Sequence, residues 1–432
     1  MPKLERVFNR IEGFKEEIIT LQSELTARVA LGPKNGGTGE HEKAKYLRER
    51  VEELRPDFMQ EIEAPDEQAQ DGYRPNLLGR WKGRNERQTV WVLSHMDIVP
   101  PGDLSLWETD PYRIRVAGDK IIGRGVEDNQ HAIVSSYLAL KAVLEADETP
   151  SKNIGLAFVA DEETGSEFGL DYCIRNHGDL FQANDLIVVP DAGNEEGTMV
   201  EIAEKSMLWL KCTISGQQCH ASTPEKGRNS LIGAADLILR LQGLKEIFSD
   251  QDDLFRPPVS TFEPTKMEAN VPNVNTIPGR DVFYMDCRIL PQHKVDEVIA
   301  RAGEIAEDLA RQSGFAVEVT PVYRQDALNP TPADAPVVGA LGKAIKYVTG
   351  LDAKVMGIGG GTVAAFFRQA GRPAAVWSTV SNSAHQPNEY CLISSIIQDA
   401  KVLAHLYLDE YVGPHIKPLA GNPQQRGRIS GC

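Results

Sequence analysis

Three short apolar segments of this sequence each end directly in acidic residues or a histidine, and this arrangement constrains the fold most strongly. The segments cover residues 89–93, 154–159 and 186–189, and they lead into Ser94-His95-Met96-Asp97, Asp161-Glu162-Glu163 and Pro190-Asp191. Apolar runs of this length predict buried strands. Ligands of open α/β sheets bind beyond the carboxyl ends of the strands. We therefore expect the three polar clusters to converge, although they lie far apart in the sequence.

The segments around these runs predict alternating helices and strands. Helical patterns cover residues 4–31 and 41–54, with a Gly-rich break at 32–39, and a further helix is expected at 130–146. Because strands alternate with helices along this part of the chain, the sequence favours an α/β sheet.

From residue 207 the pattern changes and predicts a second, inserted domain. Strands are expected at 208–215 and 282–290, and helices at 229–244 and 293–312, which together suggest a small α+β unit. A Pro-rich linker at 329–332 precedes a helix at 335–348 and a strand at 374–378. We therefore assign residues 1–206 and 323–432 to one discontinuous domain and 207–322 to the insertion, with a frayed tail at 413–432.

Composition limits the classes of partner. The 46 basic and 62 acidic residues give a net charge of −16, which disfavours nucleic acid because phosphate binding relies on clustered Lys and Arg. No apolar run approaches the ~20 residues of a membrane-spanning helix. The six cysteines are scattered and form no C-x-x-C pair. We expect a soluble cytoplasmic protein that binds no membrane.

The polar clusters at the strand ends contain residue types that bind metals. At a turn, Asp97 can accept the free imidazole N–H of His95, although a capping Asp beside a structural His is the plainer interpretation. Asp128 follows Gly123-Arg124-Gly125 near a helix start, where N-capping is its plain role. Three consecutive acids at 161–163 require cations unless they form a solvated loop. With Asp191 and His385, these residues provide three carboxylates and two imidazoles, a set that suits two divalent metals.

In order and local context, these blocks resemble the M20 metallopeptidases and their deacylase relatives over nearly the whole chain. The matching stretches are His95-Met96-Asp97 with Val99-Pro100, Trp107 and Asp110-Pro111, then Gly123-Arg124-Gly125 with Asp128, Asp161-Glu162-Glu163 with Gly165, Asp191, and His385. The resemblance implies a zinc-peptidase-like catalytic domain, with a mixed sheet flanked by helices, and an inserted α+β lid or dimerisation domain.

The resemblance also implies a role for each of these residues. His95 and Asp191 would hold one metal, and Glu163 and His385 the other, with Asp128 bridging both. Asp97 would orient His95, and Glu162 would be the general base for a water held between the metals. Zinc is the expected metal, and Co or Mn also suits mixed nitrogen and oxygen ligands.

In the inserted domain, the resemblance points to residues that contact substrate. His220, within Gly216-Gln217-Gln218-Cys219-His220-Ala221-Ser222, would reach the active site of the partner subunit in a homodimer and stabilise the oxyanion there. A structural histidine in a turn is the alternative. Asn275 and Arg288 match substrate-binding positions, although an ordinary salt bridge would explain Arg288 equally well. The substrate loop would be Gly360-Gly361-Thr362.

Two departures from the family pattern bear on specificity. Val363 follows the Gly-Gly-Thr sequence where relatives often have a polar residue, and Glu127-Asp128-Asn129-Gln130 stands where Lys-Gly or a similar pair is commoner. Relatives with Asp at the position of Asp191 tend to be dipeptidases or aminopeptidases, and relatives with Glu there tend to be acylases or carboxypeptidases. The resemblance therefore slightly favours a short-peptide substrate.

The resemblance therefore implies a two-metal hydrolase that cleaves the amide bond of a small N-acyl amino acid or dipeptide. Whether it is a dipeptidase or a desuccinylase or deacetylase stays open. A catalytically silent binding protein is the alternative class, and Glu162 argues against it because binding alone needs no base. Only the glycine run at 357–361 favours a nicotinamide-dependent oxidoreductase. This run is not followed by an acidic residue at the spacing that a dinucleotide site requires, so we discard this class.

Overall fold

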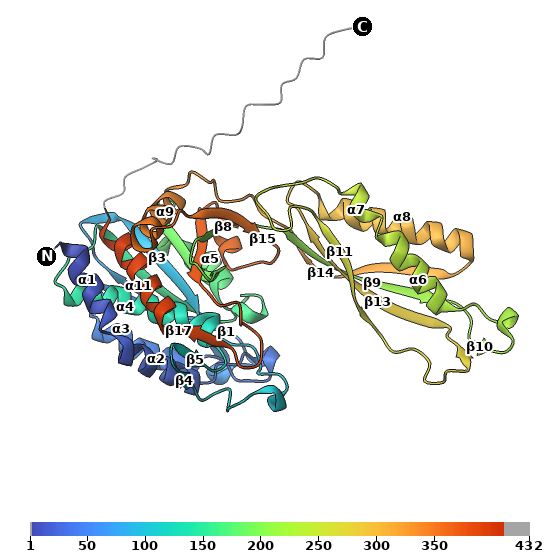
Figure 1. Ribbon diagram of the computed structural model, residues 1–432, viewed down its shortest axis with the longest axis horizontal. Helices are drawn as coiled ribbons and strands as arrows, with labels where there is room; N and C mark the ends of the chain where they lie inside the picture. The colour runs from blue at the N-terminus through green and yellow to red at the C-terminus, as the bar shows by residue number, and fades with distance from the viewer. Residues whose placement is uncertain (1, 410–432) are drawn as a thin grey trace, which may run out of the picture. The chain divides into compact units, whose positions relative to one another are not determined.

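The computed structural model describes residues 2–409 (Figure 1), so the predicted tail at 413–432 lies outside the described residues. The chain divides into two compact units. The first runs up to Val200 and takes in Pro332–Lys354 and the chain from Pro373, and the second comprises Glu201–Thr331 and Val355–Arg372. The second unit thus contains the predicted insertion at 207–322, together with flanking residues and a separate segment at 355–372.

The main sheet has eight strands in the order β1-β2-β6-β3-β7-β16-β8-β15. Their bounds are β1 Phe58–Pro65, β2 Tyr73–Trp81, β6 Lys152–Val159, β3 Asn85–His95, β7 Leu186–Asn194, β16 Ala374–Thr379, β8 Met199–Glu204 and β15 Lys354–Ile358. β1 and β2 pair antiparallel, whereas β3 pairs parallel with both β6 and β7, and β16 pairs parallel with β7. The sheet is therefore mixed, as the family resemblance implied.

The three apolar runs of the sequence are neighbouring strands of this sheet. Every residue of β6 is buried, which is the pattern of a strand in the middle of a parallel sheet. Because β3, β6 and β7 are parallel, their carboxyl ends lie at one edge, as predicted. β7 is longer than predicted, however, and Asp191 lies inside this strand and not after it.

The helices of the first unit pack against one another and against its strands. They are α1 Lys3–Glu12, α2 Lys15–Ala27, α3 His41–Glu53, α4 His131–Glu145, α5 Leu170–His177, α9 Pro336–Thr349 and α11 Ile393–Leu408. α4 and α11 lie side by side and both contact β6 (Figure 1). The helical pattern at 4–31 forms two helices, because the first ends at Gly13, whose backbone N–H caps the carbonyls of Arg10 and Ile11.

Short elements complete the first unit. A small sheet has the order β17-β5-β4, with bounds Tyr390–Leu392, Lys120–Ile122 and Arg115–Ala117. Single turns of helix occur at Pro33–Asn35, Gln70–Gly72, Leu104–Leu106, Val126–Gln130, Glu162–Thr164 and Gly178–Leu180. Two of these turns, Val126–Gln130 and Glu162–Thr164, carry residues of the predicted metal site.

The second unit is an antiparallel sheet with helices, in the order β11-β13-β9-β14. Its elements are β9 Ser206–Ser215, β10 Cys219–His220, a turn at Pro224–Lys226, α6 Ser230–Leu241, α7 Leu244–Ile247, β11 Thr261–Met267, β12 Thr276–Ile277, β13 Arg280–Ile289, α8 Val295–Ser313, β14 Ala316–Gln325 and α10 Ala364–Gln369. Alternate residues of β9, among them Leu208 and Leu210, join a core with Leu237 of α6 and Val298 of α8. The edge strands β11 and β14 were not predicted.

Two sequence expectations concern the environment of the chain. Within residues 2–409, no helix combines the length and apolar composition that crossing a bilayer requires. The five cysteines of the described chain are all free thiols, and four of them are buried. A cytoplasmic location stays a prediction.

Candidate metal centre

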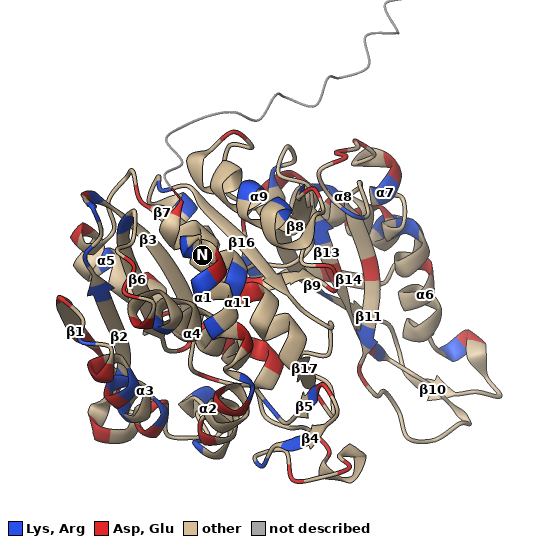
Figure 2. Ribbon diagram, turned by 60° about the vertical axis from the view of Figure 1, so that its left-hand side comes forward, with Lys and Arg blue, Asp and Glu red and all other residues tan. Residues whose placement is uncertain are grey.

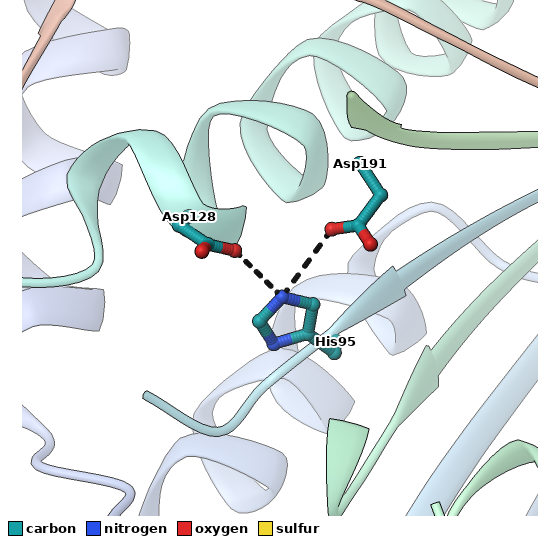
Figure 3. A group of neighbouring side chains, drawn as sticks. All are labelled: His95, Asp128 and Asp191. Atoms are coloured by element: carbon teal, nitrogen blue, oxygen red, sulfur yellow. Dashed lines mark hydrogen bonds and ion pairs between the residues drawn. The ribbon is translucent and has the colours of Figure 1, made fainter. Parts of the chain in front are cut away.

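His95 is the last residue of β3, and its imidazole is aimed at two carboxylates (Figure 3). Nδ1 lies 3.0 Å from the carbonyl oxygen of Asp97, which fixes the ring and makes Nδ1 the donor. Nε2 therefore faces Oδ1 of Asp128 at 2.9 Å and Oδ1 of Asp191 at 3.5 Å. A nitrogen that faces two carboxylate oxygens is suited to hold either a proton or a cation between them.

His385 forms a second group of the same kind around the other oxygen of Asp128. Its Nε2 lies 3.0 Å from Oδ2 of Asp128 and 3.2 Å from Oε2 of Glu163. His385 has a φ of 64°, in the left-handed region that non-glycine residues rarely adopt. Two groups of potential metal ligands thus share Asp128: His95, Asp128 and Asp191, and Asp128, Glu163 and His385.

Asp97 joins the ends of β3 and β6. Its Oδ1 accepts the backbone N–H of Glu162, and its Oδ2 accepts that of Glu163, both at 3.0 Å. Oδ1 also lies 3.5 Å from Nδ1 of His95. One buried carboxylate therefore orients the His95 ring and holds the turn that carries Glu162 and Glu163.

The carboxylates around His95 and His385 raise the pKa of both imidazoles. Burial alone would lower the pKa of His95, but hydrogen bonds with Asp128, Asp191 and Asp97 outweigh it and raise the pKa well above its ordinary value. Hydrogen bonds with Asp128 and Glu163 raise the pKa of His385 to about 10. Burial and the charge of Asp128 raise the pKa of Glu163 to about 7. The carboxylates thus favour protonation of the histidines and of Glu163 beside them.

The pKa of Glu162 is raised well above its ordinary value, first by burial and then by the charge of Asp191. The charges of Glu163 and Asp128 act in the same direction, so Glu162 lies in the field of the same carboxylates. A carboxyl with a raised pKa beside a cluster of ligands is suited to take up and release a proton.

Divalent cations suit this set of donors. Two imidazoles and three carboxylates match the nitrogen and oxygen ligands that zinc uses in catalytic sites. Oε1 of Glu163 is buried and has no hydrogen-bond partner within residues 2–409. A cation between the ligands would pair this oxygen and replace the protons on both histidines, so the residues fit the metals that the resemblance implies.

Asp161 does not share the environment of its two acidic neighbours. It is fully buried, its Oδ1 lies 3.4 Å from Nη1 of Arg74, and its Oδ2 accepts the backbone N–H of Phe168 at 3.1 Å. The positive charge beside the first of the three consecutive acids is therefore the guanidinium of Arg74 from β2.

In the second unit, the structure brings His220 and Asn275 together. They lie on or beside the short paired strands β10 and β12, and the backbone N–H of Ala221 donates to the carbonyl of Asn275 at 2.9 Å. The exposed ring of His220 accepts the backbone N–H of Ser222 at Nδ1, at 3.1 Å. In its neutral form the ring therefore carries its proton on Nε2, which leaves a hydrogen-bond donor free to meet a ligand.

Arg288 lies beside the glycine loop, also within the second unit. Nη1 donates to the carbonyl of Gly359 at 2.9 Å, while Nε and Nη2 donate to Asp286 at 2.7 and 3.0 Å. Arg288 thus makes the salt bridge that was the alternative to substrate binding. Arg288 could bind the carboxylate of a substrate through Nε and Nη2 only if that carboxylate replaced Asp286.

The loop Gly360-Gly361-Thr362 is held by its last residue. The backbone N–H and the hydroxyl of Thr362 donate to Oε1 of Glu204 at 2.9 and 2.8 Å. A Cβ at Gly361 would come within 2.7 Å of Nε2 of Gln325, so a larger residue here would displace that side chain. Val363, which follows this loop, is buried.

Three residues around the centre have roles that the sequence interpretation did not assign. Glu127 and Asn129 flank Asp128 and reach other ligand segments through their side chains, and Glu389 accepts the backbone N–H groups of Glu127 and Asp128. In the sequence, Glu127 is next to Asp128, and Glu389 follows His385 by four residues. Neither position indicates which backbone groups the carboxylate contacts.

Residues 91–409 match the family model described as peptidase family M20/M25/M40, which covers well over half of the chain. This chain belongs to the M20 peptidase family. The match includes all five residues of the two ligand groups and both Asp97 and Glu162. The protein is therefore an M20 metallohydrolase, as its motifs predicted.

M20 relatives match most of the chain. An uncharacterized metallohydrolase of Methanocaldococcus jannaschii is 41% identical over 402 residues, which are 90% of this chain and 98% of the relative. A succinyl-diaminopimelate desuccinylase of Dinoroseobacter shibae is 28% identical over 339 residues, 78% of this chain and 87% of the relative.

Solved structures of M20 type share the fold. Human carnosine dipeptidase 1 has a TM-score of 0.71 at 18% identity, covering 94% of this chain and 98% of its own. The metallo-carboxypeptidase Sso-CP2 of Sulfolobus solfataricus has a TM-score of 0.69 at 20% identity, covering 90% and 98%. The catalytic domain with an inserted lid, expected from the sequence, is thus the M20 fold.

Proposed function

We propose that this M20 metallohydrolase uses two divalent metal ions to cleave the amide bond of a small N-acyl amino acid or dipeptide. The observation that carries the proposal is the position of Asp128, whose two oxygens lie 2.9 Å from His95 and 3.0 Å from His385. One carboxylate in contact with both imidazoles is the arrangement expected of a bridging ligand. His95 and Asp191 would complete one site, and Glu163 and His385 the other.

Two bound ions would polarise a substrate carbonyl and lower the pKa of a water molecule in the site. Zinc is the metal we expect, with cobalt or manganese as alternatives for a mixed nitrogen and oxygen ligand set. The protein supplies the geometry, because the carbonyl and carboxylate of Asp97 orient the His95 ring and its carboxylate holds the turn of Glu162 and Glu163.

Glu162 is the general base in this proposal. Its carboxylate would take a proton from the attacking water and deliver it to the leaving nitrogen, because an amine anion cannot be expelled unprotonated. Burial and the charge of Asp191 raise its pKa, which supports both halves of this transfer. The same feature argues against a silent binding protein, which has no use for a proton carrier beside the metal ligands.

The second unit would supply contacts to the substrate. Nε2–H of His220, left free by the contacts of Nδ1 with Ser222, would donate to the developing oxyanion in the partner subunit. Asn275 and the loop Gly360-Gly361-Thr362 would bind the substrate backbone. Arg288 would bind a substrate carboxylate by exchanging it for Asp286, which holds the guanidinium ready in a bidentate pair.

The substrate class has two candidates. A dipeptide is favoured by Asp191 and by the dipeptidase among the neighbours in fold. An N-succinyl amino acid is favoured by the desuccinylases among the sequence relatives. Both substrates present an amide bond next to a carboxylate, so the centre and Arg288 would act alike on either.

A homodimer would form through the inserted domain. Leu231, Ile232 and Leu239 of α6 are exposed, with 43%, 66% and 73% of their surface accessible. The charged residues of this helix are Asp236 and Arg240 alone, and most of its ribbon is uncharged in Figure 2. Covering this face with a second copy would remove apolar surface from water. Sedimentation of Leu239→Glu as a monomer and of the unaltered protein as a dimer would support this face, and a dimeric variant would exclude it.

The proposed reaction is tested by reloading the metal-stripped protein with Zn²⁺, Mn²⁺ or Co²⁺. Amine release would be measured from dipeptides and from N-acetyl, N-succinyl and N-carbamoyl amino acids. Metal-dependent turnover of one class would support the hydrolase and distinguish dipeptidase from deacylase. Two tightly bound metals without turnover of any substrate would favour the binding protein instead.

A further inference from the structure

Three consecutive side chains, those of Glu127, Asp128 and Asn129, each reach a different segment of the metal centre. Asp128 contacts both histidines, as described above. Its two neighbours point elsewhere, and neither belongs to the ligand groups. These residues lie in the π-helical turn Val126–Gln130, whose irregular backbone lets successive side chains diverge.

Glu127 holds the segment that leads to His385. One oxygen of its buried carboxylate accepts the backbone N–H of Ser381, and the other accepts the backbone N–H of Ser383 at 2.5 Å and its hydroxyl at 2.7 Å. Hydrogen bonds from backbone N–H to an ionised carboxylate are among the strong ones in proteins. His385 itself is half exposed, so this anchor two residues away limits where its ring can lie.

Glu389, on the segment that carries His385, makes the reciprocal contact with the turn that carries Asp128. Its Oε1 accepts the backbone N–H groups of Glu127 at 2.9 Å and Asp128 at 3.1 Å, while its Oε2 pairs with Arg124 at 2.5 Å. The turn that carries Asp128 and the segment that carries His385 therefore lock each other through two carboxylates, those of Glu127 and Glu389, and both are buried. The distance between Asp128 and His385 depends on this lock.

Asn129 holds the other group of ligands. Its Nδ2 donates to Oδ1 of Asp191 at 2.9 Å and to the carbonyl of Pro190 at 2.8 Å. The side chain of Asp191 is mostly buried, and its Oδ1 also lies 3.5 Å from Nε2 of His95. Asn129 thus orients the carboxylate that faces His95.

We propose that Glu127 and Asn129 are positioning residues that set the affinities of the two metal sites separately. Glu127 sets the site of Glu163 and His385, and Asn129 sets the site of His95 and Asp191. This inference rests on the proposed two-metal function.

A purely structural role predicts a different result. If Glu127 and Asn129 only stabilised the fold, replacing either would lower the unfolding midpoint and weaken both sites to a similar degree. Asp399 provides the matched control, because it is a buried carboxylate of the same unit that accepts the backbone N–H of Thr379 at 2.9 Å, away from the ligand groups.

The test is Co²⁺ titration, followed by visible absorption, in single-site backgrounds. His385→Ala leaves the site of His95 and Asp191, and His95→Ala leaves the other. Glu127→Ala should weaken Co²⁺ binding about 10- to 100-fold in the His95→Ala background, the range typical of residues that orient metal ligands, and change it less than threefold in the other background. Asn129→Ala should do the reverse, and Asp399→Asn should change neither.

Three outcomes would overturn the proposal. Equal weakening of both sites by either variant, or no weakening by both, would assign the residues a structural role only. If Glu127→Ala does not fold, Glu127→Gln, which keeps one acceptor oxygen, should give the same selectivity with a smaller loss. Fewer than two Co²⁺ ions on the unaltered protein would contradict the proposed function itself, and the positioning roles with it.

Discussion

The carboxylate of Asp97 accepts the backbone N–H of Glu162 at 3.0 Å, although the two residues are 65 positions apart in the chain. The hydrogen bond joins the end of β3 to the turn after β6. Because the two strands are parallel neighbours, the residues that follow them meet at the same edge of the sheet. Glu162, the proposed base, is therefore held in place by Asp97, the residue that also orients His95.

Asp97→Asn is expected to weaken metal binding about 10- to 100-fold, because an amide nitrogen would replace one acceptor of the two backbone N–H groups. Turnover should fall with metal occupancy and recover in part at high metal concentration. Metal titration by calorimetry measures the change. Asp103→Asn, at an exposed turn where Asp103 accepts the backbone N–H of Ser105, is the control and should bind metal normally.

Glu162→Gln is expected to lower turnover about 10²- to 10⁴-fold, the range for loss of a general acid–base group, while fold and metal content stay unchanged. The reason is that the amide cannot take a proton from water. Steady-state kinetics with metal analysis checks this, and Glu167→Gln, a nearby exposed acid, should retain full turnover. Near-normal turnover of Glu162→Gln would show that another group carries the proton.

His220→Ala is expected to lower kcat about 100- to 1,000-fold, the cost of removing one oxyanion donor. Metal content should not change, because His220 belongs to the second unit and to neither ligand group. Rapid kinetics on His220→Ala and His220→Gln would separate the roles, since the glutamine amide restores a donor and should recover part of the loss. Equal turnover of the unaltered protein and His220→Ala would make it a structural residue.

Stability should fall as pH rises from about 4 to 7, in part because of Asp399. Burial raises the pKa of Asp399 to about 7, above the unfolded value, so the folded state keeps a proton that the unfolded state has released. The carboxyl therefore contributes fully only below that window. With one pKa unit worth 1.36 kcal/mol, Asp399→Asn should gain ~4 kcal/mol over the unaltered protein between pH 4 and 8.

Urea unfolding of both proteins at pH 4.5, 6 and 8 measures this difference. The amide can accept the backbone N–H of Thr379 and donate to its hydroxyl, as a protonated Asp399 would, so the variant should fold normally. A constant difference in unfolding free energy across the range would mean that Asp399 is ionised in the folded protein.

The sequence predicted the sheet strands that position the centre, because buried parallel strands are continuous apolar runs. It also predicted the helix after Asp128 and the alternating strand β9 of the second unit. It missed the edge strands β11 and β14, whose residues are mostly exposed and carry little periodic signal. The length of β7 was underestimated because Pro190 and Asp191 are typical of strand ends.

In the metal centre, the ligand residues could be predicted from the family resemblance. The hydrogen bonds that position these ligands could not be predicted from the sequence. The sequence places Asp161 beside Glu162 and Glu163, but it does not show that Arg74 of β2 pairs with Asp161. The contacts of Glu127 with Ser383 and of Asn129 with Asp191 depend on the irregular turn around Asp128. No periodicity in the sequence indicates a turn of that kind.

The bridging position of Asp128 is the central claim, and Asp128→Asn tests it most directly. The measurement is the number and affinity of Zn²⁺ ions bound by the metal-stripped protein and by the variant, with Asp103→Asn as a control for loss of a carboxylate elsewhere. We predict two ions per chain for the unaltered protein and weakened binding at both sites in Asp128→Asn. Loss of a single ion, with the other bound at unchanged affinity, would show that Asp128 serves one metal only and would contradict the account.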